Sequence, residues 1–394
     1  MTQKILVFAH VPPPHHGQSI MVREFLRGLR ADARFETYHI DARVSDSLED
    51  IGSCQLLKVV RLLKFIAQAW WLRLRHGPMM FYYVPAPAKL SAVARDWLVM
   101  SLCRPFFPGL VLHWHAYGLG EWAASENSLG RKLTKLLLSG ADLAIVLNDY
   151  NRRDAQVFSP KTTKVVENGI EDLFPDYRQS LDEIRRKRLL FIKGLAEETK
   201  TAGVSPELVR FLFLGHLTET KGVLVAIKAT ILANEKLRGA NAAWRARLIL
   251  AGSFVSAEEK KRVTDAVENA NGSAPDAPAQ VFVPGFLDSE QKKSALEGAD
   301  CLIFPTFYEN EAQPLVLIEA MSSGLPVITT SWRGVASGLP EGSRAVVEPD
   351  SSAALCSAML GVSGLVSGEP LRKAFEQKFT LPAFASRICD AIAS

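Results

Sequence analysis

The chain has 394 residues, with 48% hydrophobic residues, 22% charged residues and a formal net charge of +4. This length predicts two or three domains, and the composition is typical of a soluble α/β protein with substantial cores. The small charge, without a basic stripe interleaved with aromatic residues, argues against nucleic-acid binding. The five cysteines are scattered and form no C-x-x-C pair, which indicates a reducing, cytoplasmic compartment and no zinc site.

The first apolar run covers residues 4–10 and is followed by three prolines. It is too short for a signal peptide, so we expect a first β-strand. The sequence contains no run of 18 or more apolar residues, so we expect no transmembrane helix. The next loop contains Gly17, just before a predicted helix over 20–30. A glycine there lets the backbone approach a bound group closely, although most strand-to-helix turns contain one for geometry alone. His15 and His16 are better explained as polar loop residues than as a catalytic pair.

Four further apolar runs in the first half predict strands of a parallel sheet, at 35–40, 79–84, 110–114 and 141–147. His113 and His115 lie where the third of these runs ends. Residues just beyond the carboxyl end of a parallel strand face the crevice of a doubly wound sheet. An Asn-Gly pair at 168–169 predicts a turn, and we assign it no chemistry.

Residues 55–75 predict a basic amphipathic helix, with Lys58, Arg61 and Lys64 at helical spacing among large apolar residues. Two interpretations stay open. The helix packs on the sheet with its cations in water, or it lies on an anionic membrane with Trp70 and Trp71 at headgroup depth.

A polar stretch over 176–206 predicts a partly helical connection between domains. A strand over 211–214 then begins a second domain, and Gly215, His216 and Lys221 follow before an amphipathic helix. Strands over 247–251 and 280–283 and a helix over 289–298 continue the α/β order.

The stretch 299–332 is the most informative part of the chain. A buried strand over 301–304 stops at a proline, and a polar loop leads to a helix over 315–322 and another strand from residue 326. Glu311 precedes this helix and Glu319 lies within it. The amides at its start, including those of Leu315 and Val316, can hold an anion between the two carboxylates.

This stretch resembles the E-x7-E motif of retaining glycosyltransferases of the GT-B fold, the glycosyltransferase family 4 group. The continuation EAMSSGLPVITT and the segment 210–222 are also similar to that family. The resemblance covers nearly the whole chain in strand–helix order and is looser over the first 150 residues. It implies an α/β chain with two Rossmann-like, doubly wound parallel-sheet domains and an interdomain cleft. It also implies a hexosyltransferase that moves a sugar from a nucleotide-diphosphate sugar to an acceptor hydroxyl with retained configuration.

The resemblance assigns roles to particular residues. In the family the first Glu of the motif contacts the donor sugar and the second binds the ribose, which gives these roles to Glu311 and Glu319. The histidine near the reacting carbon would be His115, or His113 if the strand register differs. The resemblance also places the donor diphosphate at Gly17, His216, Lys221, Leu315 and Val316, and the base at Phe286 and Leu287.

Two departures from the family pattern are visible. His216 stands where the family has an arginine, and Ala312-Gln313-Pro314 replace the usual glycines. A histidine is only partly charged at neutral pH and cannot form a bidentate fork with a phosphate. Either His216 substitutes weakly for the arginine, or Lys221 carries most of the charge neutralisation.

The expected organisation is an acceptor-binding domain with linker over 1–206 and a donor-binding domain over 207–375, with a last helix, about 376–394, that packs back on the first domain. The donor would be a UDP-sugar or GDP-sugar. No cofactor is expected, and since no Asp-x-Asp cluster is present we expect a metal-independent reaction. The acceptor would be a glycan or lipid-linked glycan of bacterial surface-polysaccharide or glycolipid assembly, reached at the inner face of the plasma membrane.

Two other functions remain open. A nucleotide-sugar epimerase on a similar fold would turn over the donor without an acceptor. A non-catalytic, glycosyltransferase-like subunit would leave the donor intact with every acceptor. The departures from the family pattern at His216 and Pro314 are the reason for considering this alternative.

Overall fold

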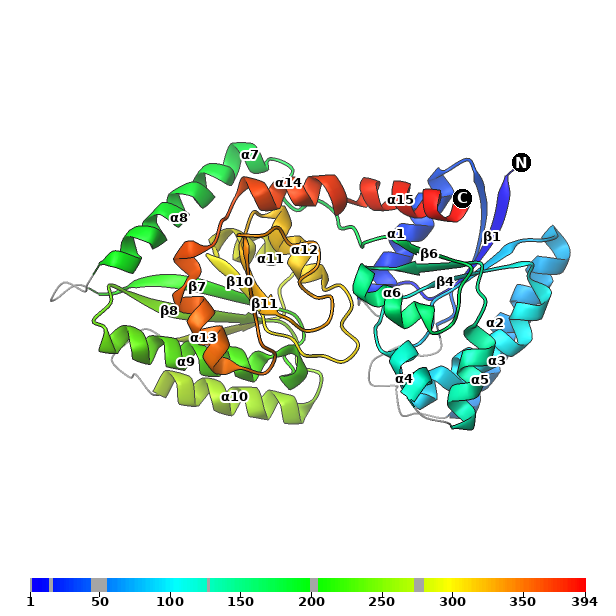
Figure 1. Ribbon diagram of the computed structural model, residues 1–394, viewed down its shortest axis with the longest axis horizontal. Coiled ribbons are helices and arrows are strands. Elements are labelled where there is room, and N and C mark those ends of the chain that lie inside the picture. Colours follow the sequence, from blue (N-terminus) through cyan, green and yellow to red (C-terminus); the bar gives the residue numbers. More distant parts are fainter. Residues whose placement is uncertain (1, 14–16, 44–54, 126–127, 199–204, 273–279) are drawn as a thin grey trace. The chain divides into compact units, whose positions relative to one another are not determined.

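The computed structural model describes residues 2–13, 17–43, 55–125, 128–198, 205–272 and 280–394. The chain divides into two units, Met1–Gly169 with Phe379–Ser394, and Ile170–Lys378. Each unit contains one six-stranded parallel sheet covered by helices (Figure 1). The predicted fold class, two Rossmann-like α/β domains, is therefore confirmed.

The first unit alternates strands and helices along the chain. Its elements are β1 (Gln3–Phe8), α1 (Gly17–Ala31), β2 (Phe35–Ile40), α2 (Gln55–His76), β3 (Met80–Tyr83), α3 (Leu90–Cys103), η2 (Arg104–Phe106), β4 (Gly109–His113), α4 (Leu119–Ser125), α5 (Leu129–Leu138), β5 (Leu143–Val146), α6 (Asp149–Gln156), β6 (Thr162–Val165) and α15 (Leu381–Ala393).

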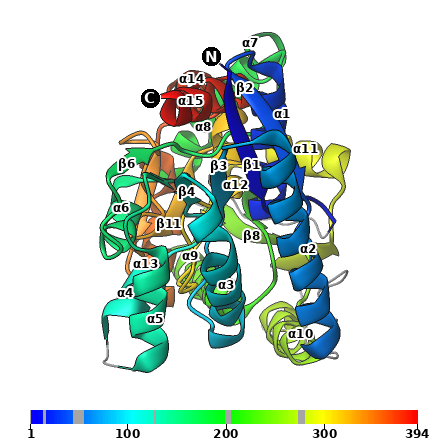
Figure 2. The ribbon, with the colours of Figure 1, turned by 90° about the vertical axis from the view of Figure 1, so that its right-hand side faces the viewer.

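The sheet of the first unit has the strand order β2-β1-β3-β4-β5-β6, so the direction of the winding reverses between β1 and β3. Parallel crossovers are right-handed, so helices on connections that run in opposite directions cover opposite faces of the sheet. Helix α15 packs against α1, with Gly28 close to Ala385. Helices α2, α3 and α5 lie side by side on the other face (Figure 2).

The second unit has the same plan. Its elements are α7 (Tyr177–Ser180), α8 (Asp182–Glu197), β7 (Glu207–Leu214), η3 (Glu219–Lys221), α9 (Val223–Gly239), β8 (Trp244–Ala251), α10 (Ala257–Gly272), β9 (Val281–Gly285), α11 (Ser289–Gly298), β10 (Cys301–Phe304), α12 (Leu315–Ser322), β11 (Val327–Thr330), β12 (Arg344–Val347), α13 (Ser352–Leu360), η4 (Val362–Gly364) and α14 (Glu369–Lys378).

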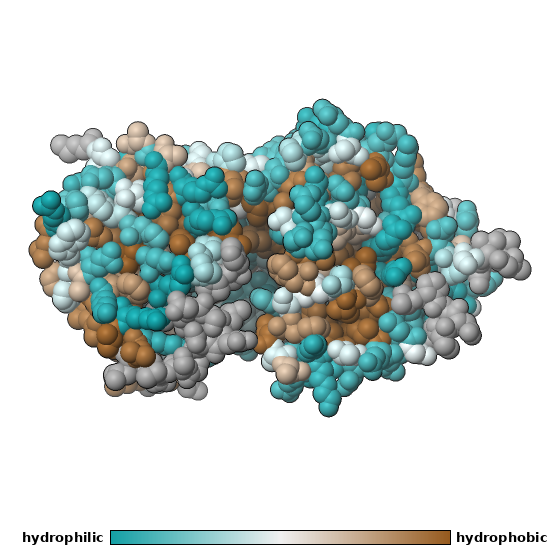
Figure 3. Space-filling model, turned by 180° about the vertical axis from the view of Figure 1, so that it is seen from behind, coloured by the Kyte–Doolittle hydropathy of each residue, from teal (hydrophilic) through white to brown (hydrophobic). Residues whose placement is uncertain are grey.

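The strand order of the second sheet is β12-β11-β10-β7-β8-β9, so the winding reverses between β7 and β10. These two central strands consist of buried apolar residues over Phe211–Leu214 and Cys301–Phe304, because helices cover both faces of the sheet. On the surface in Figure 3, hydrophobic residues lie exposed among hydrophilic ones in both units.

The segment expected to link the domains, 176–206, belongs to the second unit as far as it is described. Arg185 in α8 is buried and donates hydrogen bonds to the carbonyl oxygens of Ser323 at 2.9 Å, Ala299 at 2.6 Å and Leu296 at 2.5 Å. Arg188, one turn later, pairs with Asp300 at 2.6 Å. These bonds fix α8 to the second sheet, and the division between the units falls at Gly169 instead of residue 206.

Among the described residues, every helix is too short or too polar to span a lipid bilayer. The four described cysteines, Cys103, Cys301, Cys356 and Cys389, are free and buried. The remaining one, Cys54, and the histidines His15 and His16 lie outside the described residues.

Replacing Arg185 by Met should destabilise the second unit, because three buried carbonyl groups lose their donor. Each unsatisfied buried group costs about 1–3 kcal/mol, so we expect a loss of about 3 kcal/mol or more. Lys193→Met is the matched control, since Lys193 is an exposed cation of the same helix. Urea unfolding of both variants is the measurement, and equal midpoints for Arg185→Met and Lys193→Met would show that α8 is a loosely attached linker.

Candidate functional site

The candidate site lies in the second unit, at the carboxyl ends of β7 and β10. In open α/β sheets, ligands bind where the winding reverses, outside the carboxyl ends of the strands. The loop after β7 holds His216 and Lys221, and the loop after β10 holds Glu311. The fold thus brings together two sequence motifs that are about 90 residues apart.

Close backbone packing holds the loop after β7. Gly222 has φ +84°, and a Cβ atom there would lie 2.2 Å from the carbonyl oxygen of Pro305. The amide of Phe307 donates to the carbonyl oxygen of Thr220 at 2.8 Å. Only glycine fits this left-handed position against another backbone. Lys221 is therefore placed by two neighbouring loops and not by one flexible turn.

The side chain of Lys221 forms an ion pair with Glu311. Both side chains are largely buried, at 18% and 11% exposed. The ammonium group also lies 4.7 Å from the ring centre of Tyr308 and 5.5 Å from that of Phe304, which adds cation–π attraction. This arrangement presents one fixed positive charge at the edge of the sheet, with a carboxylate beside it.

The side chain of His216 is exposed at the surface, but its ring is partly desolvated and lies near the positive charge of Lys221. Desolvation of the ring, first, and the charge of Lys221, second, lower the pKa of His216 below its ordinary value. A histidine with a lowered pKa is mostly neutral at pH 7. Of the two interpretations left open by the sequence, the one in which Lys221 supplies most of the positive charge is therefore favoured.

Helix α12 begins directly after the loop that contains Glu311. Pro314 is its N-cap with φ −66°, and Leu315 and Val316 are its first two residues. The first amides of a helix have no partner within the helix and carry the positive end of its dipole. The amides of Leu315 and Val316 directly follow the β10–α12 connection that contains Glu311, and Glu311 pairs with Lys221. The carboxyl edge of the sheet therefore offers an anion both a cation and amide donors.

Glu319 lies one turn before the end of α12 and pairs with Lys292 of α11 at 2.6 Å. Its side chain is 12% exposed and that of Lys292 is 30% exposed. The structure thus gives each carboxylate of the motif a lysine partner. Lys292 was not among the predicted site residues, because the sequence offers no motif that joins α11 to α12.

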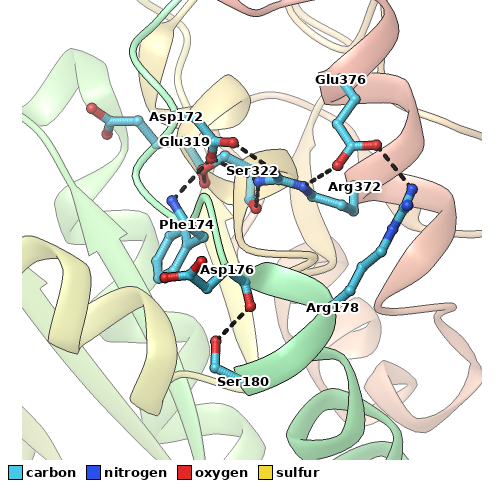
Figure 4. A network of polar contacts seen from close by, with 9 residues as sticks. All are labelled: Asp172, Phe174, Asp176, Arg178, Ser180, Glu319, Ser322, Arg372 and Glu376. Atoms are coloured by element: carbon cyan, nitrogen blue, oxygen red, sulfur yellow. Dashed lines mark hydrogen bonds and ion pairs between the residues drawn. The ribbon is translucent and has the colours of Figure 1, made fainter.

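A second network fixes the far end of α12 (Figure 4). Arg372 is buried and donates to the carbonyl oxygen of Ser322 at 2.9 Å, to Asp172 at 2.7 Å and to Glu376 at 2.8 Å. A cation at the carboxyl end of a helix satisfies its last carbonyl groups and opposes its dipole. Helix α12 is therefore held at both ends, which fixes the position of Glu319 between them.

The predicted base-binding residues follow β9, one of the two edge strands of this sheet. Phe286 is 74% exposed and follows Gly285, which has φ +87°. Leu287 is half-buried. An exposed aromatic ring at this edge offers a flat surface for stacking.

The predicted residues of the first unit lie at the carboxyl edge of its own sheet. His115 is half-buried two residues beyond β4, and its ring centre lies 4.0 Å from that of His113. His113 is fully buried, with Nδ1 2.6 Å from the hydroxyl of Tyr82, and burial lowers its pKa far below the ordinary value. His115 is therefore the more accessible of the two histidines. Gly17 is the first residue of α1.

The described residues contain no group of three or more His, Cys, Asp or Glu side chains that could hold a metal ion.

The chain is similar to known glycosyltransferases in sequence and in fold. Residues 209–363, which cover most of the second unit, match the model of the family described as "Glycosyl transferases group 1". Over nearly its whole length the chain also has the fold of sucrose-phosphate synthase from Thermosynechococcus elongatus, with a TM-score of 0.69, 19% identity and coverage of 99% of this chain and 98% of that one. The Anabaena protein HepE in complex with UDP-glucose is similar at a TM-score of 0.65 and 15% identity, with 99% of both chains covered. These likenesses show the GT-B fold.

One protein is also similar to this chain in sequence over two thirds of its length. The putative colanic acid biosynthesis glycosyltransferase WcaL of Escherichia coli K12 is 30% identical over 281 residues, which are 67% of this chain. The matched part is 62% of the length of that relative.

Replacing Lys221 by Met should weaken the binding of free UDP or GDP by about 10- to 100-fold, since a hydrogen bond to a charged group contributes about 1.5–3 kcal/mol. His216→Arg should keep or raise the affinity, because an arginine adds a bidentate phosphate contact. Titration calorimetry is the measurement. The double variant Lys221→Met/Glu311→Gln controls for the unpaired carboxylate. If His216→Arg abolishes binding in a folded protein, histidine has a specific role at this site.

Proposed function

We propose that this chain is a glycosyltransferase that moves a sugar from a nucleotide-diphosphate sugar to an acceptor hydroxyl. The observation that carries the proposal is the pairing of Lys221 with Glu311, in the loop before α12, within the region that matches the glycosyltransferase family model. A leaving diphosphate needs preorganised positive charge, and Lys221 with the amides of Leu315 and Val316 can supply it.

In this proposal the donor extends along α12. Glu311 positions the sugar at one end, and Glu319, aligned by Lys292, holds the ribose at the other. The bond between the anomeric carbon and the diphosphate oxygen breaks, a bond to the acceptor oxygen forms, and the hydroxyl proton is released. Phe286 and Leu287 receive the base.

We further propose family 4 membership, retained anomeric configuration and a reaction without a divalent metal. The E-x7-E spacing of Glu311 and Glu319 supports the first two proposals. The third is supported by the positive groups already present, Lys221 and the helix amides, which can neutralise the diphosphate. Activity should then survive an excess of EDTA.

We propose a donor of the UDP-sugar or GDP-sugar type and an acceptor in surface-polysaccharide or glycolipid assembly, met in the cytoplasm. The relative WcaL is described as a colanic acid biosynthesis glycosyltransferase, and the fold relative HepE binds UDP-glucose.

The test is acceptor-dependent donor consumption. The chain is incubated with UDP-sugars and GDP-sugars, with and without lipid-linked and soluble glycan acceptors, and release of the nucleoside diphosphate is followed. Release that needs an acceptor supports the proposal, and the anomeric configuration of the product decides between retention and inversion. Conversion of the donor sugar without an acceptor would instead indicate an epimerase, and an intact donor in every mixture would indicate a non-catalytic subunit.

Replacing Glu319 by Ala should weaken nucleotide binding about tenfold, whereas Glu311→Ala should lower kcat by about tenfold or more with little effect on binding. The reason is that a contact to the reacting sugar is realised mainly in the transition state. Glu309→Ala is the matched control, because Glu309 is an exposed carboxylate of the same loop. Equal loss of nucleotide affinity in both variants would reject this division of roles.

A further inference from the structure

Helix α2 of the first unit has two apolar faces. Leu62, Ile66 and Ala69 are buried at helical spacing and face the sheet. Trp70 is also directed inward, since its indole nitrogen donates to the carbonyl oxygen of Leu102 at 2.8 Å and its ring lies 5.2 Å from that of Phe106. Of the two interpretations left open for this helix, the one with both tryptophans at headgroup depth therefore does not hold for Trp70.

The opposite face of α2 points away from the core and is also apolar. With 100° per residue, one line along the helix lies opposite the buried residues. It contains Val60, Lys64, Ala67, Trp71 and Leu74. Trp71 is 58% exposed and Leu74 is 83% exposed, with Leu57 and Leu63 beside them at 63% and 43%. The described part of the first unit does not use this face for packing its core.

The charges on the same helix are all positive. No aspartate or glutamate occurs in α2, and Arg61, Lys64 and Arg75 are exposed on its outer side. Over residues 55–141 the sequence has 11 lysines and arginines against three acidic residues, Asp96, Glu121 and Glu126. Of these, Asp96 is buried and binds Arg95 at 3.1 Å.

Helix α5 lies on the same face of the sheet as α2 (Figure 2), and its exposed residues are again basic or apolar. It packs against α3, which in turn packs against α2. Its exposed residues are Lys132, Lys135, Leu129 and Leu136, the last two at 84% and 71% exposed. We call the exposed residues of α2 and α5 together the basic–apolar face.

We propose that the basic–apolar face docks on an anionic lipid bilayer. Apolar side chains that include a tryptophan can enter the headgroup region while adjacent lysines and arginines meet lipid phosphates. A second copy of this chain is a poorer occupant, because a two-fold interface would set one positive face against another. The proposal concerns binding alone and does not depend on the proposed enzymatic activity.

The direction of α2 relates docking to the carboxyl edge of the first unit's own sheet. The helix leads from the carboxyl end of β2 to the amino end of β3, so it starts at the sheet edge that also holds Gly17 and His115. Leu57, and Leu129 at the start of α5, lie toward that edge. Docking would therefore bring this sheet edge near the lipid headgroups, where a lipid-linked acceptor presents its sugar. Only this link between docking and the acceptor rests on the proposed function.

Vesicle co-sedimentation tests the docking. Wild-type protein is mixed with vesicles of phosphatidylcholine alone or with 30% phosphatidylglycerol, at low and high salt. We expect binding to the anionic vesicles only, weakened by salt. Each cation contributes about a fivefold gain in binding, so Arg61→Glu/Lys64→Glu/Arg75→Glu should lower the partition coefficient by about a hundredfold or more. Trp71→Ser/Leu74→Ser should also lower it.

The matched control is Lys228→Glu/Lys260→Glu/Lys261→Glu, which makes the same charge change at exposed lysines of the second unit. It should bind vesicles like the wild type. Far-UV circular dichroism and UDP or GDP affinity report whether each variant is folded. Three results would overturn the proposal. The two triple variants could be released from the vesicles equally, or the wild type could bind neutral and anionic vesicles equally. The third is a wild-type dimer in sedimentation equilibrium that is lost in Trp71→Ser/Leu74→Ser.

Discussion

The ion pair between Lys221 and Glu311 is the constraint on which the rest of the site depends. The two residues come from loops about 90 positions apart, and the pair is largely buried. Its geometry requires the left-handed backbone at Gly222, which brings the β7 loop against Pro305, and the hydrogen bond between Phe307 and Thr220. These features fix one cation at the reversal point of the sheet, where a neutral His216 adds little charge.

Helix α12 turns this constraint into an extended binding site. Its first residues follow the loop that carries Glu311, the partner of Lys221, while its last turn is held by Arg372 and, at Gly324, by close packing on Tyr177. Glu319 lies between these two fixed ends and is aligned by Lys292. A helix held in this way presents donors and a carboxylate in fixed order, which reduces the reorganisation needed when a ligand binds.

Much of the fold could be predicted from the sequence, because parallel strands covered on both faces appear as short apolar runs. The strands over 35–40 and 301–304 and the helices over 289–298 and 315–322 have the predicted bounds. The strands β6 and β12 were missed, since both lie at sheet edges and are only partly buried. The role of Arg185 and the pairing of Lys292 with Glu319 were also missed, because they depend on contacts between distant segments. For α2 the sequence showed apolar and basic residues, but only the structure separates the buried stripe from the exposed one.

Amide hydrogen exchange tests most directly whether the edge of β7 and β10 is the nucleotide site. With saturating UDP or GDP, peptides that cover 215–222 and 305–319 should exchange more slowly, because the ligand engages the loop of Lys221 and the first amides of α12. Helix α10, residues 257–272, should be unchanged. Protection confined to other segments, or none in these two while the ligand binds, would contradict the account.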